Sequence, residues 1–358
     1  MRVALNALSI ANRSGTGRYT WGLLHGFAQL RLPDLRLAIF IPSDYPIPSA
    51  WWDVPGFRFY SCSARNTVER IAWEQAILPR LLRRLQPDCL HSPASVAPVV
   101  WKPGCRSLVT IHDWAFARYP HTIPSLRRWY YRWAIPRSLA QAHRVLTDSN
   151  AMASELVSLG IPPDRIVAAH LGVDTRAFHP EPVPADAGMI KTCGPATPYF
   201  LFVGTLEPRK NLSVLIAAYS RARERGLRSD LAVAGRWGWM VESVELRQPG
   251  VHLLGHVTDE QLSALYRNAV ALAAPSLYEG FDLPVMESLA CGTPVIASDI
   301  PVHREILGEQ GRYVPVQDIE GWAVALLEFS QSGKIPVPKT VSIRDWSDVA
   351  RETYRVYL

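Results

Sequence analysis

The sequence contains no Asp-x-Asp triplet in any of its 358 residues. A site that holds a diphosphate through a divalent cation usually needs such a carboxylate pair, because hard cations prefer oxygen ligands. We therefore expect this chain to bind any phosphate ligand without a metal ion or other cofactor. The cysteines lack a Cys-x-x-Cys pair, which predicts reduced thiols and neither a zinc site nor a disulfide framework. They are Cys62, Cys89, Cys105, Cys193 and Cys291.

Long apolar runs are also absent, since none approaches the roughly 18 residues that span a bilayer. The opening segment, residues 2–6, is too short and too quickly polar for a signal peptide. Together with the cysteine usage, these absences predict a cytoplasmic protein. Apolar residues make up 48% of the chain and charged residues 20%, which is typical of an ordered globular protein. A chain of this length suits two domains better than a single core.

Charge is divided unevenly along the chain. Residues 1–178 carry a net charge of +10, and residues 179–358 carry −4. The basic half contains residues 125–134, in which arginines are interleaved with tryptophan and tyrosine. This pattern is typical of contact with an anionic membrane, but also of an ordinary helix with an aromatic core face and a solvated basic face. No recognisable nucleic-acid-binding module accompanies the charge, so we expect no nucleic-acid partner.

Short apolar strands alternate with helical segments, which predicts an α/β fold built from two Rossmann-like, doubly wound parallel sheets. A segment rich in Pro, Ala and Gly at 183–198 predicts a linker. We therefore expect a first domain at 1–182, a second at 199–340, and a C-terminal helix within 341–358 that packs near the domain junction. Strands are expected at 2–7, 35–41, 89–91, 107–111, 145–147, 199–203, 231–234, 251–255, 269–274 and 294–297.

Two glutamates, Glu279 and Glu287, stand eight residues apart across a glycine turn. Pro284 suits the first turn of a helix, and Gly292 suits the position beyond its end. The free backbone N–H groups of residues 281–283 would then point into the crevice at the carboxyl edge of the sheet, where α/β folds bind ligands. Glu287 would accept hydrogen bonds from a ribose diol. The alternative is that Glu287 only complements the helix dipole and Glu279 is a solvated loop residue.

A second candidate segment follows the strand at 199–203. Gly204 and Thr205 form a turn, and Arg209 and Lys210 stand just before a helix. Adjacent cations at this place suit a diphosphate, because arginine offers a planar fork and lysine a mobile point charge. A solvated basic turn is the simpler alternative.

Two features of the first half also favour a ligand site. The strand at 107–111 ends on His112, which would lie at the carboxyl edge of the sheet, and we expect its imidazole to be neutral. Gly15 and Gly17 form a glycine-rich turn after the first strand. A dinucleotide-binding motif is a weak reading of that turn, because the third glycine and a later acidic residue are missing.

The stretch from Pro275 to Ser298 resembles the donor-site signature of glycosyltransferase family 4, whose mark is two glutamates with seven residues between them. The resemblance covers nearly the whole chain and is strongest over 199–300. It implies the two-domain GT-B fold and transfer of a sugar from a nucleotide-sugar with retention of configuration. Asp282 stands where many relatives have a glycine, and this departure bears on sugar preference.

The resemblance also implies roles for individual residues. Arg209 and Lys210 would stabilise the leaving diphosphate, Glu279 would hold the diphosphate side and the sugar hydroxyls, and His112 would be the active-site histidine. Further donor contacts would come from Gly15, Gly17, Gly204, Thr205, His256, Val257, Gly280, Phe281, Asp282, Leu283 and Glu287.

Within the family the chain looks most like bacterial mannosyl- or rhamnosyltransferases of surface polysaccharide synthesis. This resemblance implies GDP-mannose as donor and a saccharide or lipid-linked saccharide as acceptor. It also implies that the transfer takes place at the inner face of the cell membrane. Two other classes stay open: a GT-B-fold sugar-nucleotide epimerase, and a catalytically idle sugar-binding protein.

Overall fold

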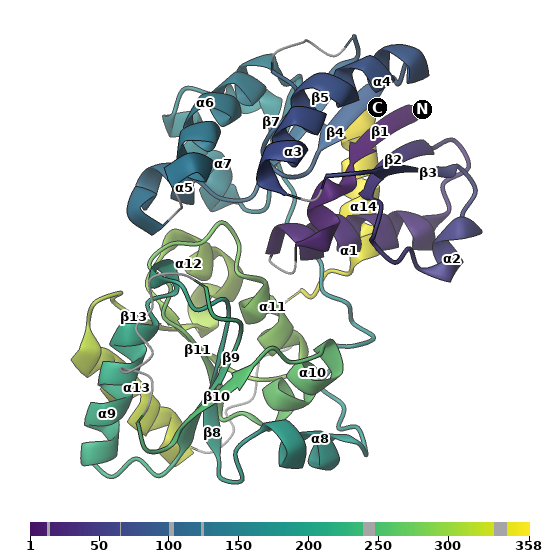
Figure 1. Cartoon of the computed structure of the whole chain (residues 1–358). Helices are drawn as coiled ribbons and strands as arrows, with labels where there is room; N and C mark the ends of the chain where they lie inside the picture. Colours follow the sequence, from purple (N-terminus) through teal and green to yellow (C-terminus); the bar gives the residue numbers. More distant parts are fainter. Residues whose placement is uncertain (13–14, 65, 100–103, 123–124, 239–247, 333–341) are drawn as a thin grey trace. The chain divides into compact units, whose positions relative to one another are not determined.

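The computed structural model describes all residues except 13–14, 65, 100–103, 123–124, 239–247 and 333–341. The described chain forms two compact units (Figure 1). Unit 1 comprises Met1–Gly172 together with Arg344–Leu358, and unit 2 comprises Val173–Ile343. The boundary expected at 340/341 lies outside the described residues.

Unit 1 is built on a seven-stranded parallel sheet with the order β3-β2-β1-β4-β5-β6-β7. Its central strands are almost continuously buried, as expected of a parallel sheet covered by helices on both faces. The strands are β1 (Arg2–Asn6), β2 (Arg36–Pro42), β3 (Phe57–Cys62), β4 (Cys89–Ser92), β5 (Arg106–Ile111), β6 (Arg144–Thr147) and β7 (Ile166–Ala168).

The longer helices of unit 1 are α1 (Gly15–Leu30), α6 (Ser125–Gln141), α7 (Asn150–Ser158) and α14 (Trp346–Tyr357). A continuous helical run covers residues 67–85, in which the π-helical turn η2 (Trp73–Ile77) joins α3 (Thr67–Ala72) to α4 (Leu78–Leu85). Shorter helices are η1 (Ala7–Ala11), α2 (Ser49–Trp52), α5 (Ala115–Arg118), η3 (Pro120–Thr122) and η4 (Pro163–Arg165).

The last helix, α14, belongs to unit 1 and packs against α1 (yellow on purple in Figure 1). Gly22 and Gly26 allow this contact. A Cβ on Gly22 would lie 2.2 Å from the Trp346 ring, and one on Gly26 would lie 2.0 Å from the Trp346 carbonyl oxygen. Asp345 caps the helix by accepting a hydrogen bond from the Asp348 N–H. The amphipathic helix expected at this end is therefore present, and its apolar face is buried in unit 1.

Unit 2 contains a six-stranded parallel sheet with the order β10-β9-β8-β11-β12-β13. Its strands are β8 (Tyr199–Val203), β9 (Asp230–Ala234), β10 (Val251–Gly255), β11 (Ala271–Ala274), β12 (Val295–Ser298) and β13 (Arg312–Val314). Its helices are α8 (Asp186–Cys193), η5 (Pro208–Lys210), α9 (Leu212–Glu224), α10 (Asp259–Asn268), α11 (Leu283–Ala290), α12 (Pro301–Leu307), η6 (Gly308–Gln310) and α13 (Ile319–Ser332).

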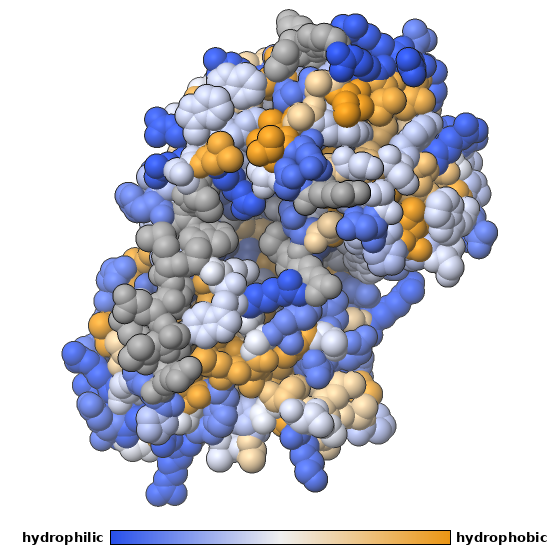
Figure 2. All heavy atoms as spheres, in the orientation of Figure 1, coloured by the Kyte–Doolittle hydropathy of each residue, from blue (hydrophilic) through white to orange (hydrophobic). Residues whose placement is uncertain are grey.

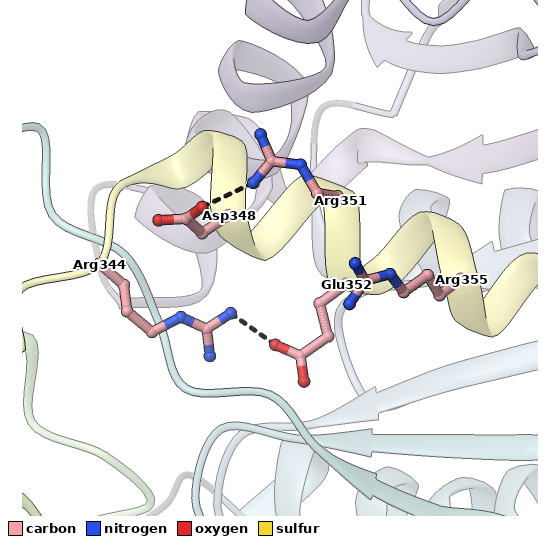
Figure 3. Close-up of a pocket in the computed structure, with 5 residues that line it drawn as sticks. All are labelled: Arg344, Asp348, Arg351, Glu352 and Arg355. Carbon is pink, nitrogen blue, oxygen red and sulfur yellow. Dashed lines mark hydrogen bonds and ion pairs between the residues drawn. The ribbon is translucent and has the colours of Figure 1, made fainter.

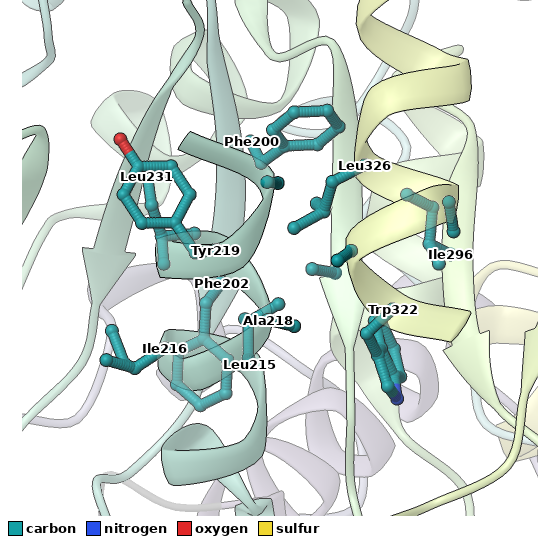
Figure 4. Close-up of a cluster of buried hydrophobic side chains, with 14 of the residues drawn as sticks. Phe200, Phe202, Leu215, Ile216, Ala218, Tyr219, Leu231, Ile296, Trp322 and Leu326 are labelled. Carbon is teal, nitrogen blue, oxygen red and sulfur yellow. The ribbon is translucent and has the colours of Figure 1, made fainter. Parts of the chain in front are cut away.

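The core of unit 2 lies between the sheet and the neighbouring helices α9 and α13 (Figure 4). Phe200 and Phe202 project from β8, Leu215 and Tyr219 from α9, and Trp322 from α13. All five side chains are essentially inaccessible to solvent. Burial of large aromatic side chains supplies much of the hydrophobic stabilisation of such a core. This packing fixes β8, the strand that leads into the candidate site.

The predicted fold class is confirmed, because both sheets are parallel and doubly wound. Three strands have no counterpart in the sequence prediction: β3, β7 and β13. The strands β7 and β13 are only three residues long, and β3 is a half-exposed edge strand that follows a Pro- and Trp-rich segment. The segment 183–198 contains α8, which packs against α10 through the Asp186–Arg267 ion pair.

The surface of each unit mixes residue types: hydrophobic and hydrophilic residues are interspersed over the face shown in Figure 2. Among the described residues, no helix combines the length and apolar character that crossing a membrane requires.

Candidate active site

The candidate site in unit 2 lies at the point where the strand order reverses. Strands β8 and β11 are neighbours at the centre of the sheet, and the chain builds outward from them in opposite directions. In such sheets the crevice beyond the carboxyl ends of these two strands binds the ligand. The loop after β8 carries Arg209 and Lys210, and the loop after β11 carries Glu279. The topology therefore brings both sequence-predicted segments to one place.

The two loops are fastened to each other by hydrogen bonds. The Leu277 N–H donates to the Arg209 carbonyl at 2.9 Å. The buried Asn211 side chain donates to the carbonyls of Pro275 at 3.1 Å and Val316 at 2.7 Å. Asn211 adopts a left-handed conformation with φ of +55°, which asparagine tolerates better than most residues. The sequence analysis missed Asn211, although Asn is a common residue at such positions.

Glu279 joins the two cations. Its Oε2 lies 2.6 Å from Arg209 Nη1, and its Oε1 lies 2.6 Å from Lys210 Nζ. Arg209 also donates to Glu207 at 2.7 Å, and Lys210 lies 3.4 Å from Asp282. The side chains of Glu279 and Lys210 are only 8% and 11% exposed. The alternatives of a solvated Glu279 and a solvated basic turn are therefore wrong.

The charges in this cluster hold one another in the ionised form. Burial alone would raise the pKa of Glu279, but Arg209 and Lys210 outweigh burial and lower it to about 2. Burial alone would likewise lower the pKa of Lys210, but the neighbouring carboxylates of Asp282 and Glu279 raise it. Both side chains are thus charged at neutral pH, and two fixed cations lie at the carboxyl edge of the sheet.

Gly204 directly follows β8 and has a φ of +154°, which disfavours any other residue. A Cβ on Gly204 would lie 3.2 Å from Lys210 Cε, so glycine also makes room for the lysine side chain. Thr205 follows Gly204 and is half-buried. These two residues therefore shape the path of Lys210 into the cluster.

The helix α11 follows the second loop, with Pro284 in its first turn. Gly280, Phe281, Asp282 and Leu283 are buried just before and at its start. Asp282 has a φ of +86°, in the left-handed region that glycine prefers. An aspartate at this position therefore has a higher conformational energy than a glycine would have.

Glu287 is 3% exposed, and its Oε2 accepts a hydrogen bond from the Tyr266 hydroxyl at 3.2 Å. It is therefore anchored inside the unit by α10. The sequence analysis did not single out Tyr266, whose partner is 21 residues away.

His256 and Val257 follow β10, the edge strand of the sheet, and are exposed and half-buried respectively. They lie at the same carboxyl edge as Arg209 and Glu279, because all strands run parallel. Strand β9 lies between β10 and β8 in the sheet. The predicted contact of these two residues with a nucleotide base stays a prediction.

In unit 1, His112 ends β5 and is held on both sides of its ring. Nδ1 lies 2.6 Å from the Asp148 carboxylate, and Nε2 lies 2.6 Å from the Pro93 carbonyl oxygen. Both neighbours are hydrogen-bond acceptors, so both ring nitrogens donate and the imidazole is positively charged. Burial lowers the pKa of His112, but Asp148 more than offsets this and raises it above its ordinary value. The expectation of a neutral imidazole is wrong, because the sequence did not reveal the two acceptors.

This pair makes the stability of unit 1 depend on pH. The raised pKa means that its stabilisation is complete below the ordinary histidine pKa, about 6.5, and is lost as pH rises through the folded-state pKa. Asp148→Asn is expected to cost about 1.5–3 kcal/mol at pH 5.5–6, and less at alkaline pH. Urea unfolding from pH 5.5 to 9.5 measures this difference.

The matched control is Glu155→Gln, which removes the carboxylate partner of the exposed Arg118 in the same unit. It should show no such pH dependence. An Asp148→Asn effect that is constant over this pH range would contradict the charged pair.

The glycine turn at the start of α1 has a structural reason at one position. A Cβ on Gly17 would lie 1.6 Å from the Asn12 carbonyl oxygen, so close backbone approach requires glycine there. A Cβ on Gly15 would have no atom within 4 Å, and Gly15 is exposed. Gly15, Gly17 and His112 lie in unit 1, and the other predicted site residues lie in unit 2.

A pocket also lies along α14 in unit 1 (Figure 3). Arg344 pairs with Glu352 at 2.5 Å, and Arg351 pairs with Asp348 at 2.7 Å. Two of the three arginines that line the pocket are thus paired with carboxylates. None of the sequence-predicted site residues lies there. Within the part of the chain that the structure describes, no three His, Cys, Asp or Glu side chains gather as a metal site would require.

Two family models match the chain. Residues 13–177 match "Glycosyltransferase Family 4", and residues 197–332 match "Glycosyl transferases group 1". Together these matches take in most of both units. They include His112 in unit 1 and the cluster of Arg209, Lys210 and Glu279 in unit 2.

Curated relatives are similar over part of their length. The chain is 32% identical to O-antigen chain mannosyltransferase B of Escherichia coli over 63% of this chain and 61% of that protein. It is 32% identical to a phosphatidyl-myo-inositol mannosyltransferase of Mycolicibacterium smegmatis over 52% of this chain and 50% of that one. The chain thus spans about three fifths or less of these relatives.

Solved structures show the same fold at low identity. Anabaena Alr3699/HepE in complex with UDP and glucose matches with a TM-score of 0.75 and 15% identity, over 99% of both chains. Sucrose-phosphate synthase from Thermosynechococcus elongatus matches with a TM-score of 0.69 and 19% identity, over 100% of this chain and 98% of that one. The fold is therefore GT-B, and with both family models matched the chain belongs to glycosyltransferase family 4.

Proposed function

We propose that this protein transfers a hexose from a nucleoside-diphosphate sugar to an acceptor hydroxyl, with retention of configuration and without a metal ion. The observation that carries this proposal is the buried cluster in which Glu279 bridges Arg209 and Lys210. Preorganised cations at this edge of the sheet suit a group that gains negative charge as the reaction proceeds.

The departing diphosphate is that group. As the bond between the sugar carbon and the phosphate oxygen breaks, the electron pair stays on the diphosphate, beside the guanidinium of Arg209 and the ammonium of Lys210. Glu279 holds both cations in place and offers its carboxylate to sugar hydroxyls. The N–H groups at the start of α11 add further positive potential. Retention needs no protein nucleophile here, because the leaving phosphate takes the proton of the attacking hydroxyl.

Mannose is the favoured sugar and GDP-mannose the favoured donor, because the relatives named above are mannosyltransferases. The acceptor is a saccharide or a lipid-linked saccharide of surface polysaccharide synthesis, by the same reasoning. The roles of His112, Gly15 and Gly17 in the reaction stay predictions.

A thermal-shift screen with UDP, GDP, ADP and dTDP, each with and without EDTA, tests donor binding directly. The correct nucleotide at 100 times its Kd adds about 2.7 kcal/mol to stability. We expect GDP to give the largest shift and EDTA to leave it unchanged. Loss of the shift in EDTA would contradict metal independence.

Nucleotide release that depends on an acceptor separates the remaining classes. A transferase releases GDP only when both donor and acceptor are present. An epimerase would change the sugar nucleotide without releasing nucleotide, and an idle sugar-binding protein would bind the donor and leave it intact.

We further propose that α6 contacts an anionic membrane, at the cytoplasmic face where a lipid-linked acceptor would be presented. Tyr130 and Ala134 of this helix are buried in unit 1, whereas Leu126 and Trp129 are 58% and 66% exposed. Two exposed arginines, at positions 127 and 132, lie on the same helix. Apolar side chains flanked by cations suit a surface of anionic lipid headgroups.

Sedimentation with phosphatidylglycerol vesicles tests this contact, with phosphatidylcholine vesicles as reference. Leu126→Ser/Trp129→Ser is expected to abolish sedimentation with the anionic vesicles. The matched control is Trp52→Ser on α2, which removes a tryptophan that is 62% exposed in the same unit. Equal sedimentation of the double variant and the wild type would exclude α6 as the contact.

A further inference from the structure

A further titratable side chain lies behind the cluster of unit 2. His303, on α12, is completely buried. Its Nε2 lies 3.1 Å from Asp282 Oδ2, and its Nδ1 lies 2.9 Å from the Ser298 carbonyl oxygen. Asp282 in turn reaches Lys210 through its other oxygen at 3.4 Å. The sequence analysis assigned no role to His303, which stands 21 residues from Asp282.

The surroundings of His303 indicate its charge. A carbonyl oxygen only accepts hydrogen bonds, so Nδ1 carries a proton, and Nε2 faces a carboxylate and carries one too. The Ser298 hydroxyl also lies 3.3 Å from Nδ1, and a hydroxyl can accept a hydrogen bond as well as donate one. The Tyr313 hydroxyl of β13 lies 3.5 Å from the His303 carbonyl oxygen, and the neighbouring Arg304 is exposed and paired with Asp299.

The charge balance of the cluster supports the same conclusion. Among the described ion pairs of the cluster, three carboxylates (Glu207, Glu279 and Asp282) pair with two permanent cations (Arg209 and Lys210), so these carboxylates outnumber these cations by one. A protonated His303 makes the cluster neutral. Burial of an unpaired charge is costly, so the neutral arrangement is favoured.

Asp282 has a second unusual property, its left-handed backbone conformation with φ of +86°. An aspartate there is strained relative to glycine, and its two oxygens contact Lys210 and His303. A glycine would relieve the strain but leave both contacts unmade. The strained residue is therefore the link between the buried histidine and the lysine of the cluster.

We propose that Asp282 and His303 are positioning residues that set the place and the effective charge of Lys210, with His303 acting as a third, buried cation of the donor site. This inference rests on the proposed function. His303 withdraws part of the charge of Asp282, so that Asp282 orients the Lys210 ammonium without neutralising it. Both side chains act on the reaction through Lys210.

Two kinetic results are expected. His303→Gln lowers kcat by about 10-fold or more, while the donor KM changes less than about twofold, because Lys210 acts mainly on the departing diphosphate. The kcat of the double variant Asp282→Asn/His303→Gln is no lower than that of the more impaired single variant, since the two residues act as a unit.

The matched control is His252→Gln. It removes another histidine–aspartate pair of unit 2, between His252 and Asp230, on strands at the other end of the same sheet. Its kcat and KM should equal those of the wild type. A His303→Gln variant that keeps wild-type kcat would overturn the inference.

A measurement without turnover separates this inference from the proposed function. The ¹⁵N chemical shifts of the His303 ring in the wild type should show both nitrogens protonated, and Asp282→Asn should move them toward a neutral ring. Neutral-ring shifts in the wild type would overturn the inference whatever the enzyme does. If instead the ring is protonated but no nucleotide binds, the proposed function fails alone. These shifts also decide the matter should His303→Gln not fold.

Discussion

Replacement of Arg209 or Lys210 by alanine is expected to lower kcat by about 10²–10³, the usual effect of losing a preorganised charge stabiliser. Each side chain lies in a buried cluster, so it needs no reorganisation when charge develops on the diphosphate. Steady-state kinetics with saturating donor and acceptor measures the effect. Unchanged kinetics in the Arg209→Ala/Lys210→Ala double variant would refute the role of the cations.

This experiment needs a control for stability, because Glu279 would lose both of its cationic partners. Addition of Glu279→Gln to the double variant removes the orphaned charge and should restore folding without restoring activity. Arg225→Ala is the matched surface control: its guanidinium is 47% exposed, pairs with Glu320 in the same unit, and should not affect kcat. Strict dependence of wild-type activity on added Mg²⁺ or Mn²⁺ would contradict the metal-free mechanism.

Replacement of Glu287 by alanine is expected to raise the donor KM with a smaller effect on kcat. The loss of a charged hydrogen bond to the ribose costs about 1.5–3 kcal/mol, which corresponds to roughly 10- to 150-fold in binding. Titration of the nucleotide against both proteins measures this directly, because binding does not require the acceptor. An unchanged KM would show that Glu287 serves only the helix α11 and its neighbours.

Two controls separate a ribose contact from a packing defect. Tyr266→Phe removes the hydroxyl that donates to Glu287 at 3.2 Å but keeps the carboxylate, so it should raise KM far less. A 2′-deoxy nucleotide should bind the wild type more weakly than its ribose counterpart. The Glu287→Ala variant should bind the two equally, and a preserved preference for ribose would contradict the assignment.

The parallel α/β class could be predicted from the sequence because the buried strands, such as Ser107–Ile111, are short apolar runs separated by helical periodicity. The placement of Arg209, Lys210 and Glu279 in one cluster could also be anticipated, since parallel strands bring their carboxyl ends to one edge. Local pattern and topology suffice for such features.

The partners of these residues could not be predicted in the same way. His303 meets Asp282, and His112 meets both Asp148 and the Pro93 carbonyl, through loops that leave no periodic signal. A single histidine or aspartate is common in any sequence, and only its surroundings decide its charge. The prediction of a neutral imidazole at His112 was wrong for this reason.

The chain passes from unit 1 to unit 2 at Gly172–Val173 and returns to unit 1 at Ile343–Arg344. These two points set the order in which the ribosome synthesises the parts of each unit. Unit 2 is fully synthesised while unit 1 still lacks α14, whose residues Trp346 and Tyr357 are 5% and 1% exposed in the finished structure. Nascent unit 1 therefore exposes the apolar face of α1 until the last helix emerges. Domains generally fold as units during synthesis, whereas unit 1 gains α14 only after unit 2 has been made.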